Sequence, residues 1–149
     1  MYAGKGEFEN ALVQHQKALE IRTRVFGSEH PDVAASYNNI ANIYRQQAKY
    51  EKALEYYQKH LDITVRLIGG DHPDVARSHG NIGIVLESMG KYEEALFHDQ
   101  KRLDIRIRVF GGDHPDVAAS YNNIGLVYGS QGQYERALEY YQKGLEIRI

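Results

Sequence analysis

Apolar residues recur along the chain in two alternating stripes, and each stripe has the spacing of one face of an α-helix. The first stripe follows Pro31 and consists of Val33, Tyr37, Ile40, Ala41 and Tyr44. The second stripe follows a short break and consists of Tyr50, Ala53, Leu54, Tyr57, Leu61 and Val65. Proline at a first helical position and glycine just past a helix end are typical boundary residues. The pattern therefore predicts two amphipathic helices joined by a turn at residues 47–49.

This two-helix pattern repeats every 42 residues. The prolines that begin the first helix are Pro31, Pro73 and Pro115, and the aromatic residues that begin the second helix are Phe8, Tyr50, Tyr92 and Tyr134. A fixed period of this length indicates stacked supersecondary units that bury their apolar faces against one another. Because the turn is short, the two helices of a period must run antiparallel. We therefore expect Tyr37 to face Tyr57, and Ala41 to face Ala53.

The middle copy departs from its neighbours at two positions that this register places opposite each other. His79 and Asp99 stand where both other copies have tyrosine. We expect His79 to face Asp99 and to satisfy its carboxylate, which would otherwise be costly in a half-buried seam. One interpretation is a hydrogen-bonded substitute for two packed rings. The alternative is a fragment of a catalytic dyad or a pH switch. The sequence favours the first, because no nucleophile or third group accompanies the pair.

The repeated pattern resembles a known family. Its most regular positions are Ile40, Ala41, Tyr44, Tyr50, Ala53, Tyr57 and Leu61, with equivalents 42 and 84 residues further on. With the His-Pro-Asp-Val-Ala start and the Leu-Glu-Ile-Arg end, the pattern resembles the tetratricopeptide repeat in the 42-residue form of kinesin light chains. The resemblance covers almost the whole chain and implies an all-α, right-handed superhelical solenoid of antiparallel helix pairs with seven helices. His60 and Arg102 depart from it, since the family usually has alanine there.

The repeats predict a single solenoid domain over residues 1–149 with no linker. Residues 1–26 read as a truncated repeat with only its second helix, and three fuller copies cover residues 31–68, 73–110 and 115–149. Residues 1–6 match residues 127–132, so Tyr2 would belong to the last turn of a preceding first helix. We therefore expect the chain to be a piece of a longer array. We also expect its two ends to associate with other molecules, because solenoids usually need polar capping repeats for solubility.

Composition and charge limit the classes of partner and the cellular compartment that we expect for this protein. The net charge is −2 with both signs interspersed, so we expect neither nucleic-acid nor membrane binding. The chain has no cysteine and no apolar run near the ~20 residues of a membrane span, and we expect no signal peptide. These features favour an intracellular, cytoplasmic protein whose partners are proteins or peptides.

The histidines are the residues that most suggest chemistry. His30, His72 and His114 recur beside an aspartate, but equivalent positions on packed helices are at least ~8–10 Å apart. Zinc ligands must lie ~2 Å from one ion, so these histidines cannot converge, and helix-start packing is the preferred interpretation. The sequence shows no nucleophile motif and no phosphate-binding loop. We therefore expect no catalytic residues, no metal and no cofactor, and hence no enzyme.

The polar face of the first helices is the predicted binding site. An asparagine recurs at Asn39, Asn81 and Asn123, and an amide offers both donor and acceptor to the backbone of an extended ligand. In arrays of the resembled family, the first helices line a concave groove that binds extended peptides. The full predicted set is Asn38, Asn39, Asn42, Arg45, Arg77, Asn81, Asn122 and Asn123. The alternative is that these amides bond to neighbouring repeats and space the helices.

Three functions follow from these features. The first is a protein-interaction scaffold that binds an extended peptide in the groove. The second is a self-assembly element, possible because the terminal repeats are incomplete and could associate with another chain. The third is a regulatory or sensor array of a larger protein. A further surface alternative is an acidic partner bound by the arginines at the second-helix ends, which are Arg22, Arg24, Arg66, Arg106, Arg108 and Arg148.

Overall fold

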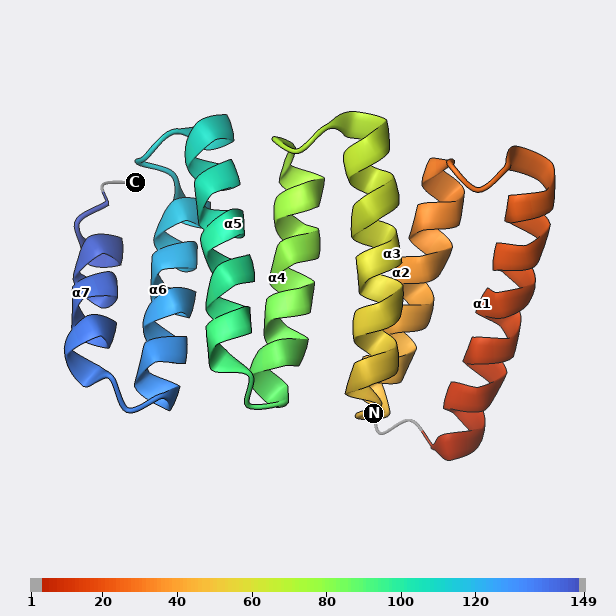
Figure 1. The fold of residues 1–149 in the computed structure, drawn as a ribbon, viewed down its shortest axis with the longest axis horizontal. Helices are drawn as coiled ribbons and strands as arrows, with labels where there is room; N and C mark the ends of the chain where they lie inside the picture. Colours follow the sequence, from red (N-terminus) through yellow and green to blue (C-terminus); the bar gives the residue numbers. More distant parts are fainter. Residues whose placement is uncertain (1–3, 148–149) are drawn as a thin grey trace. The chain divides into compact units, whose positions relative to one another are not determined.

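The computed structural model describes residues 4–147, and these residues form seven α-helices and no strand (Figure 1). The helices are α1 (Lys5–Phe26), α2 (Pro31–Gln46), α3 (Tyr50–Ile68), α4 (Pro73–Ser88), α5 (Tyr92–Phe110), α6 (Pro115–Ser130) and α7 (Tyr134–Leu145). The predicted all-α fold of antiparallel helix pairs is therefore present in the described chain. The expectations for Tyr2, Arg148 and the end of the last repeat lie outside the described residues.

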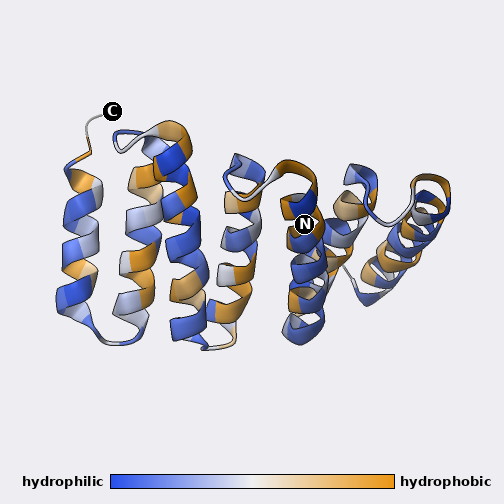
Figure 2. Cartoon of the chain, turned by 45° about the horizontal axis from the view of Figure 1, so that its top comes forward, coloured by the Kyte–Doolittle hydropathy of each residue, from blue (hydrophilic) through white to orange (hydrophobic). Residues whose placement is uncertain are grey.

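The helices group into two compact units, residues 1–69 and residues 70–149. In the first unit α2 packs against both α1 and α3. In the second unit α5 packs against α4 and α6, and α6 also packs against α7. We call α2, α4 and α6 the first helices and α3, α5 and α7 the second helices of their pairs. Hydrophobic and hydrophilic positions are interspersed along each helix (Figure 2).

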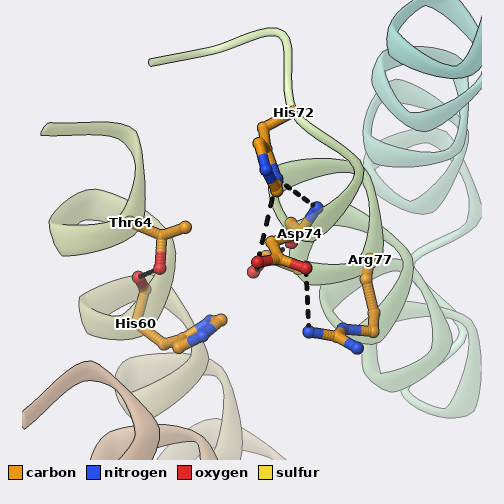
Figure 3. A network of polar contacts seen from close by, with 6 residues as sticks. His60, Thr64, His72, Asp74 and Arg77 are labelled. Carbon is orange, nitrogen blue, oxygen red and sulfur yellow. Dashed lines mark hydrogen bonds and ion pairs between the residues drawn. The ribbon is translucent and has the colours of Figure 1, made fainter. Parts of the chain in front are cut away.

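Each first helix begins with the same histidine cap. Nδ1 of His72 accepts a hydrogen bond from the backbone N–H of Asp74 at 3.0 Å, as Figure 3 shows. His30 and His114 make the same bond at 3.1 and 3.0 Å. The proline that follows occupies the first turn, where its missing N–H is not needed. The recurring histidines are therefore helix caps, which satisfy a backbone donor that the helix leaves unpaired.

The turn within each helix pair uses a left-handed residue. Gly90 and Gly132 have φ values of 75° and 76°, and Ala48 has φ of 60° at the equivalent position of the first pair. Glycine adopts this conformation without steric cost, whereas a Cβ makes it unfavourable. The first pair therefore has the same turn as the others, but with a strained residue in it.

Small residues are buried near the centre of the helix pairs. Ala41 and Ala53 are fully buried in the first unit. Each unit also contains a cluster of buried apolar side chains. In the first unit they include Val33, Ala34 and Ile63, and in the second unit Leu103, Val117 and Ile124. These clusters exclude water and fix the helices of each unit against one another.

The aromatic register differs from the expectation by one residue. The ring of Tyr37 packs on Tyr56 rather than Tyr57, with centroids 5.9 Å apart, and Tyr44 stacks on the same Tyr56 ring at 5.6 Å. Tyr57 is buried and its hydroxyl instead donates to Asn42. A residue on one helix packs into the gap between residues of the other, so the expectation of directly opposed rings was wrong.

Candidate functional site

Each first helix has one stripe of residues that its neighbours leave uncovered, which we call the open face. The four positions are spaced i, i+4, i+7 and i+11, so they lie on one side of a helix. The residues are Ala35, Asn39, Asn42 and Gln46 on α2, Arg77, Asn81, Ile84 and Ser88 on α4, and Ala119, Asn123, Leu126 and Ser130 on α6. All twelve are exposed or half-buried. A peptide bound to the first helices would therefore contact this open face.

The recurring asparagines Asn39, Asn81 and Asn123 lie on this face, and all three are half-buried. Among residues 4–147, no hydrogen bond involves their side-chain amides. Each amide therefore keeps a donor and an acceptor for another molecule, in a position where water is partly excluded.

The other predicted asparagines serve the helix pairs instead. Asn42 lies on the open face, but its carbonyl oxygen accepts the hydrogen bond of Tyr57. Asn122 lies against α7, where its Oδ1 is 2.7 Å from the place a Cβ on Gly144 would take. The Oδ1 of Asn38 is buried and has no partner among the described residues. Asn38 and Asn122 precede Asn39 and Asn123 by one residue, which turns them about 100° towards the second helix.

The two predicted arginines differ in accessibility. The guanidinium of Arg45 lies 6.0 Å from the ring centre of Tyr57, so it packs over its own helix pair. Arg77 is exposed on the open face of α4 and forms an ion pair with Asp74 at 3.2 Å (Figure 3). Such an exposed pair is worth little to stability and leaves Arg77 able to meet a ligand carboxylate.

Two apolar residues of the open face were missed by the sequence reasoning. Ile84 and Leu126 are 47% and 55% exposed, at the position that Asn42 occupies in the first pair. The signal was available, because both residues fall outside the apolar stripe that packs on the second helix. They give the open faces of α4 and α6 an apolar contact beside the free amides of Asn81 and Asn123.

Arginines at the second-helix ends make contacts within each unit. In the second unit, Arg106 donates to the hydroxyl of Ser120 at 2.8 Å and to the backbone oxygen of Asp116 at 3.0 Å. In the first unit, Arg22 bonds to Ser36 at 2.7 Å. Two outer arginines form the exposed ion pairs Arg66–Glu29 and Arg108–Asp71. These contacts favour a structural role over a stripe for an acidic partner.

The predicted pair of His79 with Asp99 does not form. Nδ1 of His79 lies 3.0 Å from Nδ1 of His98, and the two ring centroids are 5.2 Å apart. His98 is the residue of α5 that is equivalent to Tyr56 of α3. The residue that faces His79 is therefore one position earlier than the sequence register predicted, as it is for Tyr37. Burial, the neighbouring His98 and Lys101 lower the pKa of His79 to about 4. Burial also lowers the pKa of His98, partly opposed by Glu94, so both imidazoles are neutral at pH 7.

Asp99 instead pairs with Arg102 on its own helix. The guanidinium donates to Oδ1 of Asp99 at 3.1 Å, and both side chains are buried. Burial raises the pKa of Asp99 to about 6, while Arg102 opposes this shift and Glu87 adds to it. The carboxylate is therefore ionised at pH 7. Because it is held by an arginine, the pair offers no general base to a substrate, and the dyad interpretation has no structural support.

Comparisons with known proteins place these observations in a family context. The tetratricopeptide repeat model matches residues 1–64, 37–107 and 98–149. The crystal structure of BtubC (BKLC) from P. vanneervenii aligns with a TM-score of 0.85 and 28% identity, over 96% of this chain and 57% of BtubC. A Podosopora anserina protein described as a kinesin light chain with nearly identical TPR-like repeats aligns with a TM-score of 0.81 and 22% identity, over 95% of this chain and 67% of its own. No curated protein sequence matches.

Proposed function

The chain belongs to the tetratricopeptide repeat family, whose repeats generally mediate protein–protein interaction, and we propose that it binds an extended peptide along the open faces of the first helices within one unit. The observation that carries this proposal is the set of half-buried amides at Asn39, Asn81 and Asn123, which make no hydrogen bond within the described chain. An extended backbone offers N–H and C=O groups at regular intervals, which such amides can pair with whatever the side chains.

The residues on the open faces of the second unit indicate which kind of peptide would bind there. Its open faces combine an amide with an exposed apolar side chain, Asn81 with Ile84 on α4 and Asn123 with Leu126 on α6. Arg77 adds a positive charge on α4. The favoured ligand is therefore an extended segment with alternate apolar side chains and an acidic residue. Backbone pairing would give affinity, and the apolar and basic contacts would give sequence preference.

A peptide-display selection tests this proposal. The library is panned against the chain, and enriched peptides are titrated by fluorescence polarisation against variants. We expect Asn81→Ala and Asn123→Ala each to weaken binding about tenfold, the effect of losing a hydrogen bond worth ~1.4 kcal/mol. Gln100→Ala is the matched control, because it removes an exposed amide from α5, where Gln100 bonds only to Asp104. Equal binding by all variants, or no enrichment at all, would contradict the proposal.

A second candidate function is association through α7. Tyr134, Leu138 and Leu145 are 70%, 66% and 79% exposed on one face of this helix. The residue of α5 equivalent to Leu145 is Leu103, which is buried in a cluster with Val117 and Ile124 of α6. The uncovered face of α7 thus matches a surface that another first helix covers. Light scattering across a concentration range tests this, and a mass that stays at 17.0 kDa would argue against it.

A further inference from the structure

We propose that His79 and His98 form a binding site for one divalent transition-metal ion of the zinc or nickel class. The two Nδ1 atoms come from different helices, α4 and α5, and lie 3.0 Å apart. Imidazole nitrogen is a preferred ligand of these ions.

The spacing fits a bidentate site. Zinc–nitrogen bonds are about 2.0–2.1 Å, so two ligands of one tetrahedral ion lie about 3.3 Å apart. The present separation is that of a hydrogen bond, in which one Nδ1–H donates to the other Nδ1. A metal needs a widening of about 0.3 Å and a turn of each ring. The donor ring changes tautomer as it binds, so that its proton moves to Nε2 through solvent and both Nδ1 lone pairs face the ion.

The protonation state already suits metal binding. Histidine binds a metal only when neutral, and the surroundings keep both rings uncharged at pH 7. The charged groups that act on the pair are Glu94, which favours a cation beside His98, and Lys101, which opposes one beside His79. Asp99 is the nearest carboxylate in sequence but is held by Arg102. The ring of Phe97 packs edge-on against His98, with centroids 5.2 Å apart.

The site offers two protein ligands. Water or a side chain of another molecule would fill the remaining coordination positions. Among residues 4–147, no cluster of three or more histidines, cysteines or carboxylates could hold a metal. The proposed ion would therefore keep open coordination positions. Each imidazole is only about half-buried, so such positions can be reached from solvent.

The other two helix pairs supply the control. Tyr37 with Tyr56, and Tyr121 with Tyr140, occupy the same places with ring centroids 5.9 and 6.2 Å apart. The double variant His79→Tyr/His98→Tyr therefore gives the middle pair the rings that its neighbours already accommodate. It also keeps five of the seven histidines, including the three caps, whose Nδ1 atoms are occupied.

The experiment is a titration of the untagged, metal-free chain with Zn²⁺ and Ni²⁺ by calorimetry at pH 7.5. We expect one saturable site per chain, weakened at least tenfold in the double variant. Co²⁺ provides a second readout, because its visible absorption should report imidazole coordination in the natural chain and be lost in the variant. If circular dichroism shows the double variant to be unfolded, His98→Gln replaces it. Equal binding by natural and variant chains, or no saturable site in the natural chain, would overturn the proposal.

Discussion

Arg102 and Asp99 form a buried ion pair within a single helix, with Nη2 of the arginine 3.1 Å from Oδ1 of the aspartate. Two glycines of the facing helix leave room for it. A Cβ on Gly80 would lie 2.6 Å from the Arg102 guanidinium, and one on Gly83 would lie 2.7 Å from the Asp99 carboxylate. Gly80 stands where the other first helices have Asn38 and Asn122, so the departures on α5 are matched by a smaller residue on α4.

Breaking this ion pair should destabilise the chain in a pH-dependent manner. Arg102→Met leaves the buried, ionised Asp99 without its partner, and we expect a loss of about 3 kcal/mol in the free energy of unfolding at pH 7.5. The loss should shrink at pH 5, because the pKa of Asp99 is about 6 and the carboxyl is then protonated. Arg108→Met is the control, since its exposed pair with Asp71 should be worth less than about 1 kcal/mol. Urea unfolding at both pH values measures this, and equal losses for the two variants would contradict it.

Adding a methyl group at Gly83 should have the opposite effect from adding one at Gly129. Alanine is the better helix former by about 1 kcal/mol, so Gly129→Ala, with nothing within 4 Å of the new Cβ, should raise stability. Gly83→Ala forces the Cβ against a carboxylate that Arg102 holds in place, and overpacking of this kind costs about 1–3 kcal/mol. Thermal unfolding of both variants measures the difference. A rise in melting temperature for Gly83→Ala would show that Asp99 can move away freely.

The strained turn at Ala48 predicts a stabilising substitution. Its φ of 60° is unfavourable for alanine but not for glycine, which both equivalent turns use. Ala48→Gly should therefore raise the free energy of unfolding by about 0.5–1 kcal/mol, net of the extra freedom glycine has in the unfolded chain. Gly90→Ala is the reciprocal test and should lower it by a similar amount. The idea fails if both substitutions change stability in the same direction.

The neutral histidine pair predicts a loss of stability in mild acid. The pKa of His79 is about 4 in the folded chain, below the 6.5 of an unperturbed imidazole, so the unfolded chain binds more protons between these values. The stabilising contribution is complete above pH 6.5 and is lost as the pH falls towards 4. Asp99 has the opposite sign, because its raised pKa makes protonation favour the folded chain.

These opposing contributions can be separated by comparing melting temperatures from pH 7.5 to pH 4. The variant His79→Tyr/His98→Tyr should lose less stability on acidification than the natural chain, since only the natural chain must protonate the buried imidazoles. A parallel decline in the two proteins would show that the pair does not govern the acid response.

Much of the fold followed from local signals. The helices begin at Pro31, Pro73 and Pro115, as the sequence predicts. Such boundaries depend on backbone chemistry within a few residues, so they can be read without knowing what the helices touch. The proposed binding face was harder to predict, because its asparagines lie only one residue along the chain from the asparagines that face the second helix. A shift of one residue turns a side chain by about 100°, which decides whether it meets solvent or the next helix.

The sequence by itself determined the period, the helices and the antiparallel pairing, because a 42-residue repeat of apolar stripes and helix boundaries admits no other regular arrangement. Only the tertiary structure decided which side chains meet between the helices. Interdigitation shifted the contacts by one residue, so that His79 pairs with His98 and leaves Asp99 to Arg102. That shift is set by the shapes of side chains on both helices at once, and a one-dimensional pattern does not contain it.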